Sequence, residues 1–317
     1  MSTATEPTKS GVGRVPAGPL QLSLREWLDV LKRAGKQFLK DDCMGLAQQV
    51  AYSALLAFLP SVILLIGLLG LFGPGAFSSV ERFIGSVAPH GVTQMIQLAK
   101  DDAAHNKSGS AIAFVVGTFA AGWAASGAMG SVIKAVNRAY DRIETRPFWK
   151  TRLTAIVLVI ATGLATAVMF LLIVFGGGLG DAIVRRTGLG GDFKLVWNIA
   201  RWPIAFAAVL LFFALVYYLA PNTKQRSWRW VSPGSLVGSV LWLVLSGLFA
   251  LYTSFSGSYA KTYGSIAGAI VLLLWLNYSA WAILFGAELN AELDRQANIH
   301  AAGGAQAGLV KPARRTD

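Results

Sequence analysis

The sequence has few charged residues for its length. Of its 317 residues only 14% are Asp, Glu, Lys or Arg, whereas a soluble domain usually carries about a quarter. Hydrophobic residues make up 54% of the chain, and the mean hydropathy is +0.53. This composition excludes a soluble enzyme, and it also excludes a disordered basic protein that binds nucleic acid.

Residues that bind metals or act as nucleophiles are also scarce. The single cysteine, Cys43, excludes an internal disulfide and a thiolate cluster, and the three histidines are His90, His105 and His300. The sequence has no His-Glu-x-x-His motif, no Gly-x-Ser-x-Gly elbow and no Gly-x-x-x-x-Gly-Lys-Ser/Thr loop. We therefore expect a protein that is not an enzyme, binds no metal and uses no cofactor.

What the sequence does have is six long stretches without any charged residue. Each exceeds the roughly 20 residues that a helix needs to cross about 30 Å of hydrocarbon. The stretches are continuously apolar rather than alternating, which favours helices over the strands of a membrane β-barrel. We place spans at 46–72, 111–133, 153–175, 202–219, 234–252 and 266–285. The predicted fold is all-α: a polytopic membrane protein with six transmembrane helices.

Basic residues are distributed unevenly between the two sides of these spans. The N-terminal arm, the second and fourth loops and the C-terminal tail together hold 20 of the 28 Lys and Arg residues. Cytoplasmic segments of membrane proteins retain such a basic excess. Both termini are therefore expected in the cytoplasm.

The composition divides the chain into four parts. Residues 1–20 predict a disordered N-terminal arm, because they are rich in Ser, Thr, Gly and Pro. Residues 21–41 predict an amphipathic helix on the cytoplasmic membrane surface, with its bases near anionic headgroups. The alternative is that its apolar face packs on the protein's own cytoplasmic loops. Residues 42–294 form the membrane domain, with short helices on the outer face, and 295–317 form a flexible cytoplasmic tail.

Polar side chains within the spans, or at their cytoplasmic ends, are the candidates for function. Such groups are costly in hydrocarbon and usually face a cavity or a partner. Eight of them are candidates to line a substrate cavity: Gln48, Gln49, Tyr52, Asn137, Tyr140, Asn277, Glu288 and Asn290. Arg138 and Arg152 are candidate ion-pair partners for Glu288, which otherwise extends to water at its helix end. Pro60 lies within the first span and predicts a static bend or a hinge.

Small residues at four-residue spacing mark helix faces that can pack closely. They occur in three spans, as Gly122, Ser126 and Gly130, as Gly234 and Gly238, and as Gly264 and Gly268. We expect them to pack helices within one chain, although a homo-oligomer would use the same faces.

Four blocks of the sequence resemble one known family. They are residues 47–60 (AQQVAYSALLAFLP), 135–152, 217–234 and 263–290. These blocks are similar to the YihY/BrkB family of bacterial inner-membrane proteins, which has also been labelled a virulence factor or ribonuclease BN. The resemblance implies a six-span protein of the bacterial cell inner membrane with cytoplasmic ends. It also implies an involvement in moving envelope lipids.

Three functions follow as hypotheses. The first is a transporter or flippase for a lipid or other amphipathic substrate that works without ATP hydrolysis. The second is an envelope scaffold or assembly factor that transports nothing. The third is a ribonuclease, which is disfavoured because RNA cleavage needs convergent carboxylates or a positioned acid and base, and the basic loops hold few acids. The expected partners are membrane lipids, especially anionic lipids of the inner leaflet, and not nucleic acid.

Overall fold

The computed structural model describes residues 23–72, 107–174, 184, 186, 191–223, 232–255 and 266–301. Within them the chain forms seven long helices and no strand. The helices are α1 (Leu24–Lys40), α2 (Cys43–Phe72), α5 (Lys107–Ala139), α6 (Phe148–Val174), α8 (Gly191–Leu219), α9 (Pro233–Phe255) and α11 (Ile266–Ala301). The predicted all-α fold is confirmed. The short outer-face helices and the N-terminal arm were predicted for segments outside the described residues.

Six of these helices are long and apolar enough to cross a membrane, as predicted. The candidate spans are Cys43–Leu64, Phe114–Ala139, Phe148–Met169, Asp192–Leu219, Pro233–Thr253 and Gly268–Gln296. We call the end of the molecule where α1 lies the α1 end. At this end α5 and α11, the helices of the second and sixth spans, extend beyond the predicted spans. There α11 continues to Ala301, so any flexible tail begins later than residue 295.

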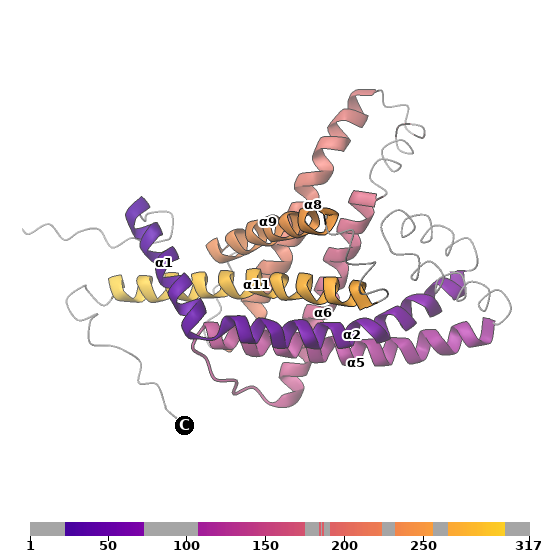
Figure 1. Ribbon diagram of the computed structural model, residues 1–317, viewed down its shortest axis with the longest axis horizontal. Helices are drawn as coiled ribbons and strands as arrows, with labels where there is room; N and C mark the ends of the chain where they lie inside the picture. Colours follow the sequence, from indigo (N-terminus) through magenta and orange to yellow (C-terminus); the bar gives the residue numbers. More distant parts are fainter. Residues whose placement is uncertain are drawn as a thin grey trace, which may run out of the picture.

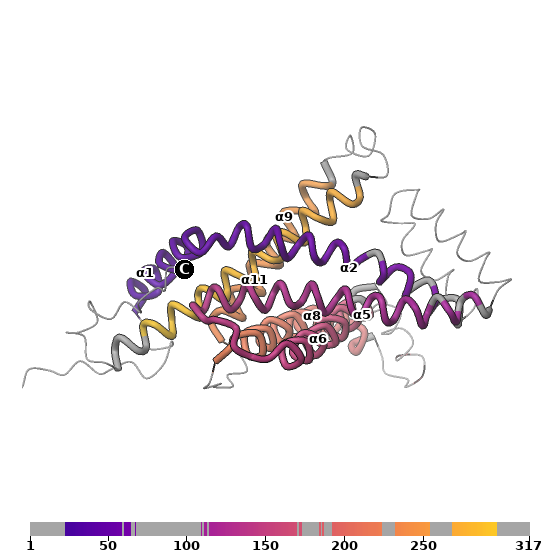
Figure 2. The backbone as a smooth tube through the Cα atoms, turned by 90° about the horizontal axis from the view of Figure 1, so that it is seen from below, coloured from indigo at the N-terminus to yellow at the C-terminus, as the bar shows by residue number. Residues whose placement is uncertain are grey.

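The six span helices form a ring in chain order. Helix α2 packs on α5, α5 on α6, α6 on α8, α8 on α9, α9 on α11, and α11 packs back on α2. Helices α2 and α5 run side by side, and α1 crosses at the end where α2 begins and where α5 and α11 finish (Figures 1 and 2). The ring therefore brings segments that are distant in sequence together at the α1 end.

Buried apolar side chains are concentrated toward the α1 end. The main core joins Ala47 of α2, Ile133 of α5, Leu158 of α6, Val216 of α8 and Leu284 of α11. Toward the opposite end, large apolar side chains are exposed on several helices, among them Phe119, Leu164, Ile199 and Leu248. In a bilayer such side chains meet lipid tails, so their exposure carries little cost.

Helix α1 has the amphipathic character that its sequence predicts. It begins with a capping box, in which Ser23 and Glu26 satisfy each other's backbone N–H groups at 3.3 and 2.7 Å. One flank of its apolar face, with Val30 and Ala34, packs on Leu289 of α11. The other flank, with Leu24, Leu28 and Leu39, is exposed. Packing on the protein's own helices therefore uses only part of this face and leaves the rest available for lipid.

Pro60 lies inside α2, and the helix continues through it to Phe72. Proline removes the donor that would bond the carbonyl of Leu56. In the next residue, the hydroxyl of Ser61 donates to the carbonyl of Ala57 at 2.8 Å. The structure thus has a proline-containing helix at this position, and a hinge motion there stays a prediction.

The predicted small-residue faces differ in how closely they are packed. A Cβ atom on Gly234 of α9 would lie 2.2 Å from the carbonyl oxygen of Gly286 of α11, so these two backbones touch. A Cβ atom on Gly122 of α5 would have no neighbouring atom of the described chain within 4 Å. The same spacing therefore marks a helix contact in one span and an open surface in another.

We predict opposite outcomes for alanine at these two glycines. Gly234→Ala should lower the free energy of unfolding by about 1–3 kcal/mol, because the new methyl group forces α9 away from α11. Gly122→Ala should raise the free energy of unfolding by a few tenths of a kcal/mol, because alanine has the higher helix propensity and its methyl group meets no described atom. Thermal unfolding of both variants in the same detergent measures the difference. Equal losses in the two variants would contradict the close α9–α11 contact.

Candidate functional site

Two tight turns at the α1 end determine the shape of the candidate site. Asp42 directly precedes α2 and has φ of 52°, and its carboxylate accepts the backbone N–H of Gly45 in the first turn of α2 at 3.3 Å. Asp141 follows α5 with φ of 50°, and the next N–H, of Arg142, donates to the carbonyl of Asn137 at 2.8 Å. This is the Schellman ending of a helix, with aspartate in the left-handed position that it tolerates better than most residues.

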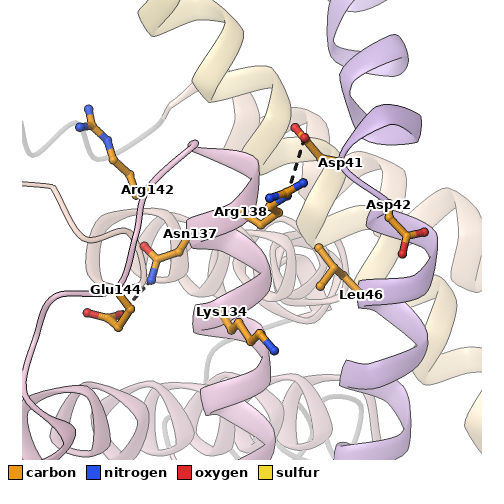
Figure 3. A pocket seen from close by; sticks show the side chains of 8 residues that line it. All are labelled: Asp41, Asp42, Leu46, Lys134, Asn137, Arg138, Arg142 and Glu144. Carbon is orange, nitrogen blue, oxygen red and sulfur yellow. Dashed lines mark hydrogen bonds and ion pairs between the residues drawn. The ribbon is translucent and has the colours of Figure 1, made fainter. Parts of the chain in front are cut away.

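An open pocket of about 400 Å³ lies between these two turns (Figure 3). It is lined by Asp41, Asp42, Leu46, Lys134, Asn137, Arg138, Arg142 and Glu144. All of these except Leu46 are polar, and they come from the α1–α2 turn, the last turns of α5 and the loop that follows α5.

The acids of this pocket at positions 41 and 144 already have partners. Asp41 is 2% exposed, lies 3.8 Å from Nε of Arg138, and accepts a 2.6 Å hydrogen bond from Gln37. Glu144 lies 2.6 Å from Nη2 of Arg146. The Arg146 guanidinium holds the pKa of Glu144 below its ordinary value. These carboxylates therefore stabilise the pocket walls.

The bases of the pocket are not all neutralised in this way. Lys134 and Arg142 are exposed and line the pocket, and within the described residues neither side chain has a hydrogen-bond or ion-pair partner. The pocket thus offers two cationic side chains to a ligand. Arginine and lysine donors of this kind suit phosphate or carboxylate groups.

Asn137 joins the wall of the pocket to α8. Its Oδ1 accepts the backbone N–H of Asn222 at 2.7 Å, and its Nδ2 donates to Glu144 at 2.9 Å. Close by, Arg146 donates to the carbonyls of Leu219 and Ala220 at 3.1 and 2.7 Å, which caps the C-terminal end of α8. Asn137 is therefore a lining residue whose amide is already engaged in structure.

A second group of polar residues is buried at the same end, where α2, α5 and α11 meet. Glu288 is 0% exposed, and its Oε1 accepts the Sγ–H of Cys43 at 3.5 Å. Asn290 accepts the N–H of Gly234 and donates to Ser232, both at 2.9 Å. Burial and the charge of nearby Asp294 raise the pKa of Tyr140, and its hydrogen bond with Asn290 acts in the opposite direction.

Of the eight predicted cavity residues, the structure brings together Tyr140, Glu288 and Asn290. It places Asn137 in the wall of the open pocket. Gln48, Gln49 and Tyr52 are exposed on the surface of α2. Asn277 lies earlier on α11, about three turns before Glu288, where its Oδ1 is buried without a hydrogen-bond partner among the described residues. The structure therefore does not gather all eight into one cavity.

The two candidate partners of Glu288 contact other groups. Arg138 lies against Asp41. Arg152 donates to the carbonyl of Trp123 at 2.9 Å and lies 4.1 Å above the ring of that residue. Because Arg138 and Arg152 bind elsewhere, Glu288 contacts Cys43 and neither of these arginines.

Sequence reasoning missed several residues of this region. Asp41, Cys43, Lys134, Arg142 and Glu144 are not among the sequence candidates, because the charges beside the spans are already explained by topology and the single cysteine shows no pattern. One available signal was the Asp41–Asp42 pair between two helices, since aspartate often starts a helix. A second available signal was the run of charged residues at 134–146, directly after the second predicted span.

The sequence profile of the family described as virulence factor BrkB matches residues 34–308 of this chain. The chain belongs to the BrkB family. The ribonuclease-like protein YfkH of Bacillus subtilis strain 168 is 32% identical over 272 residues, which cover 86% of this chain and 98% of that protein. A UPF0761 membrane protein of Idiomarina loihiensis is 29% identical over 99 residues, 31% of this chain and 34% of that protein. No solved structure matches.

The name of YfkH describes that protein as ribonuclease-like, and the chemistry of the BrkB-family chain can be compared with it. Across the residues that the structure describes, no group of three or more His, Cys, Asp or Glu side chains is placed to hold a metal ion. Of the acids that line the pocket, Asp41 and Glu144 are engaged by Arg138 and Arg146, and Asp42 accepts the N–H of Gly45. Nothing in this geometry adds support for the ribonuclease hypothesis.

We predict that Arg146→Gln destabilises the protein by about 1–3 kcal/mol, because buried carbonyls and Glu144 lose a charged donor. The stability that Glu144 contributes is complete above about pH 4.3 and is lost as the pH falls through its lowered pKa. The deficit of the variant should therefore shrink in acid. Thermal unfolding from neutral pH downward tests this. Arg142→Gln, which removes a base without a described partner, is the control and should change stability by less than about 0.5 kcal/mol.

Proposed function

We propose that this BrkB-family protein moves an amphipathic lipid with an anionic headgroup across the bacterial inner membrane. It does so without ATP hydrolysis and without covalent chemistry. The pocket between the two turns is the headgroup site in this proposal, and Lys134 and Arg142 are the side chains that contact the headgroup.

The observation that carries the proposal is the unequal pairing of charge in the pocket. Asp41 and Glu144 are engaged by arginines and Asp42 accepts the N–H of Gly45, while the side chains of Lys134 and Arg142 have no described partner. An anionic phosphate attracts such bases and accepts their hydrogen bonds. Anionic lipids are concentrated in the cytoplasmic leaflet, which is the side on which the charge bias of the sequence puts this pocket.

The apolar surfaces of the helices support a substrate with a hydrocarbon tail. Side chains such as Phe119, Ile199 and Leu248 are exposed toward the end opposite the pocket. On α1, the exposed flank of Leu24 and Leu28 adds an apolar surface beside the exposed bases Arg25 and Lys32. A lipid whose headgroup occupies the pocket can keep its tail against such surfaces and within the bilayer.

Both termini lie in the cytoplasm in this proposal. The contact between α1 and the last turns of α11 supports it, because both ends of the described chain then lie on one side. We predict that a green fluorescent protein fused after residue 317 fluoresces, and that alkaline phosphatase fused there is inactive. The reverse pair of results would contradict the proposed orientation.

We predict that purified protein in liposomes speeds the exchange of a fluorescent anionic phospholipid between leaflets. Replacing Lys134 and Arg142 together by Gln should lower this rate at least about tenfold, because two charge-assisted contacts of the headgroup are lost. Lys150→Gln removes an exposed base in the first turn of α6 that does not line the pocket, and it should retain the rate.

Two results would count against lipid transport. Equal exchange rates in empty and protein-containing liposomes would favour the scaffold hypothesis instead. Equal slowing by the double variant and by Lys150→Gln would show that general surface charge, and not the pocket, matters.

A further inference from the structure

Glu288 is an acidic residue that the proposed headgroup site does not use. It lies on α11 against Cys43, the first residue of α2, and it is 0% exposed. Its Oε1 accepts the weak Sγ–H donor of Cys43 at 3.5 Å. Its Oε2 is buried and, within the described part of the chain, has no hydrogen-bond partner.

The groups around Glu288 do not supply a counter-ion. Asp41 approaches from the α1–α2 turn, and Tyr140 and Asp141 approach from the end of α5. Arg295, later on α11, is the nearby cation, but it binds both Glu292 and Asp141. Arg138 binds Asp41. Among the described residues, the surroundings of Glu288 are therefore apolar, neutral polar or acidic, and the guanidinium of Arg295 is already shared by two other carboxylates.

An ionised carboxylate in such a position would lose its hydration without gaining a cation or strong donors. A neutral carboxylic acid avoids most of this cost, because it carries no charge to be solvated. We infer that Glu288 is a proton-binding site. The proton comes from cytoplasmic water and is held on the carboxylate between α2 and α11.

Binding and release of this proton have a structural consequence. The structure has α11 packed against the start of α2 through the contact between Glu288 and Cys43, and in the proposal this packing belongs to the protonated state. After release, the carboxylate needs water or a cation, so the contact between α2 and α11 must loosen beside Asp41, which also lines the pocket. The inference rests on the geometry of Glu288 and holds whatever substrate the protein moves.

Glu292 is a matched acid one turn farther along the same helix. It is 7% exposed, but it lies 3.4 Å from Nε of Arg33 and also binds Arg295. Glu288 and Glu292 therefore share a helix and a high degree of burial, and they differ in whether cations surround them. Glutamine has nearly the shape of glutamic acid but neither charge nor a titrating proton. Replacing each acid by glutamine therefore tests the role of charge and proton at each position with little change in packing.

The first test is the pH dependence of thermal stability in lipid nanodiscs for the wild-type chain, Glu288→Gln and Glu292→Gln. The native wild type must hold a proton that the unfolded chain releases, so its stability falls as the pH rises from about 6 to about 8. The melting temperature of Glu288→Gln should therefore rise relative to that of wild type by a few degrees per pH unit. Glu292→Gln should melt below wild type by a nearly constant amount. A constant deficit for Glu288→Gln as well would overturn the inference.

The second test is infrared spectroscopy of the wild-type protein, which needs no stable variant. At neutral pH the spectrum should contain the carbonyl stretch of a protonated carboxyl group, and this band should be absent in Glu288→Gln. If that variant does not fold, Cys43→Ser should shift the band, because a hydroxyl is a stronger donor to Oε1 than a thiol. A spectrum without such a band at neutral pH would overturn the assignment.

The remaining rival ligand is a monovalent cation. Melting temperatures measured in sodium, in potassium and in choline salts should agree, because a proton site needs no inorganic cation. If the melting temperature fell markedly in choline alone, and Glu288→Gln removed this difference, the site would bind a metal cation. That result would overturn the assignment of Glu288 as a proton site. Absence of lipid transport leaves all of these results unchanged, so the two proposals can fail separately.

Discussion

Helices in a bilayer gain little from packing apolar side chains together, because the lipid tails that they displace are equally apolar. The structure depends on polar contacts that lipid cannot replace, and the described ones are concentrated at the α1 end. Arg146 caps α8, and Asn137 binds the turn after it. Asn290 ties α11 to α9, and Arg295 ties α11 to the turn after α5. The ring of six helices is thus fastened mainly at one end.

The polar groups at the α1 end are of two kinds, those with partners of opposite charge or carbonyl partners and those without counter-ions in the described chain. Arg146 binds Glu144 and two carbonyls at the end of α8, and removing it would leave buried acceptors unpaired, which is costly. Arg295 binds Glu292 and the more exposed Asp141. Lys134, Arg142 and Glu288 lie among the same turns without counter-ions in the described chain. Lys134 and Arg142 are exposed, so water solvates them and pairing would add little stability. Glu288 is buried, and a protein that needed it only for stability would gain by pairing or replacing it. The unpaired state of Glu288 is therefore the physical reason to connect it with a ligand.

The sequence was sufficient for the features that depend on local order along the chain. Six uncharged stretches predicted six spans, and the periodicity of residues 24–40 predicted α1. It was insufficient where the outcome depends on which face of a helix meets a neighbour. Gly122 and Gly234 occur in similar patterns, yet only Gly234 touches another backbone. Gln49 and Glu288 are both polar residues at helix ends, but one is exposed and the other buried. Those differences arise from the ring arrangement and from the turns at Asp42 and Asp141, which no single segment specifies.

Asp41 connects the two proposed sites, since it lines the pocket, binds Arg138 and lies near Glu288. An anionic headgroup that drew Arg138 toward itself would leave the charge of Asp41 less neutralised. A more negative Asp41 favours the protonated form of Glu288, because like charges disfavour ionisation nearby. Headgroup binding and proton binding would then strengthen each other, and linkage requires the effect to be equal in both directions. On this argument the inner-leaflet lipid and a cytoplasmic proton occupy the protein together, and loss of the proton both loosens α2 from α11 and weakens the hold on the lipid.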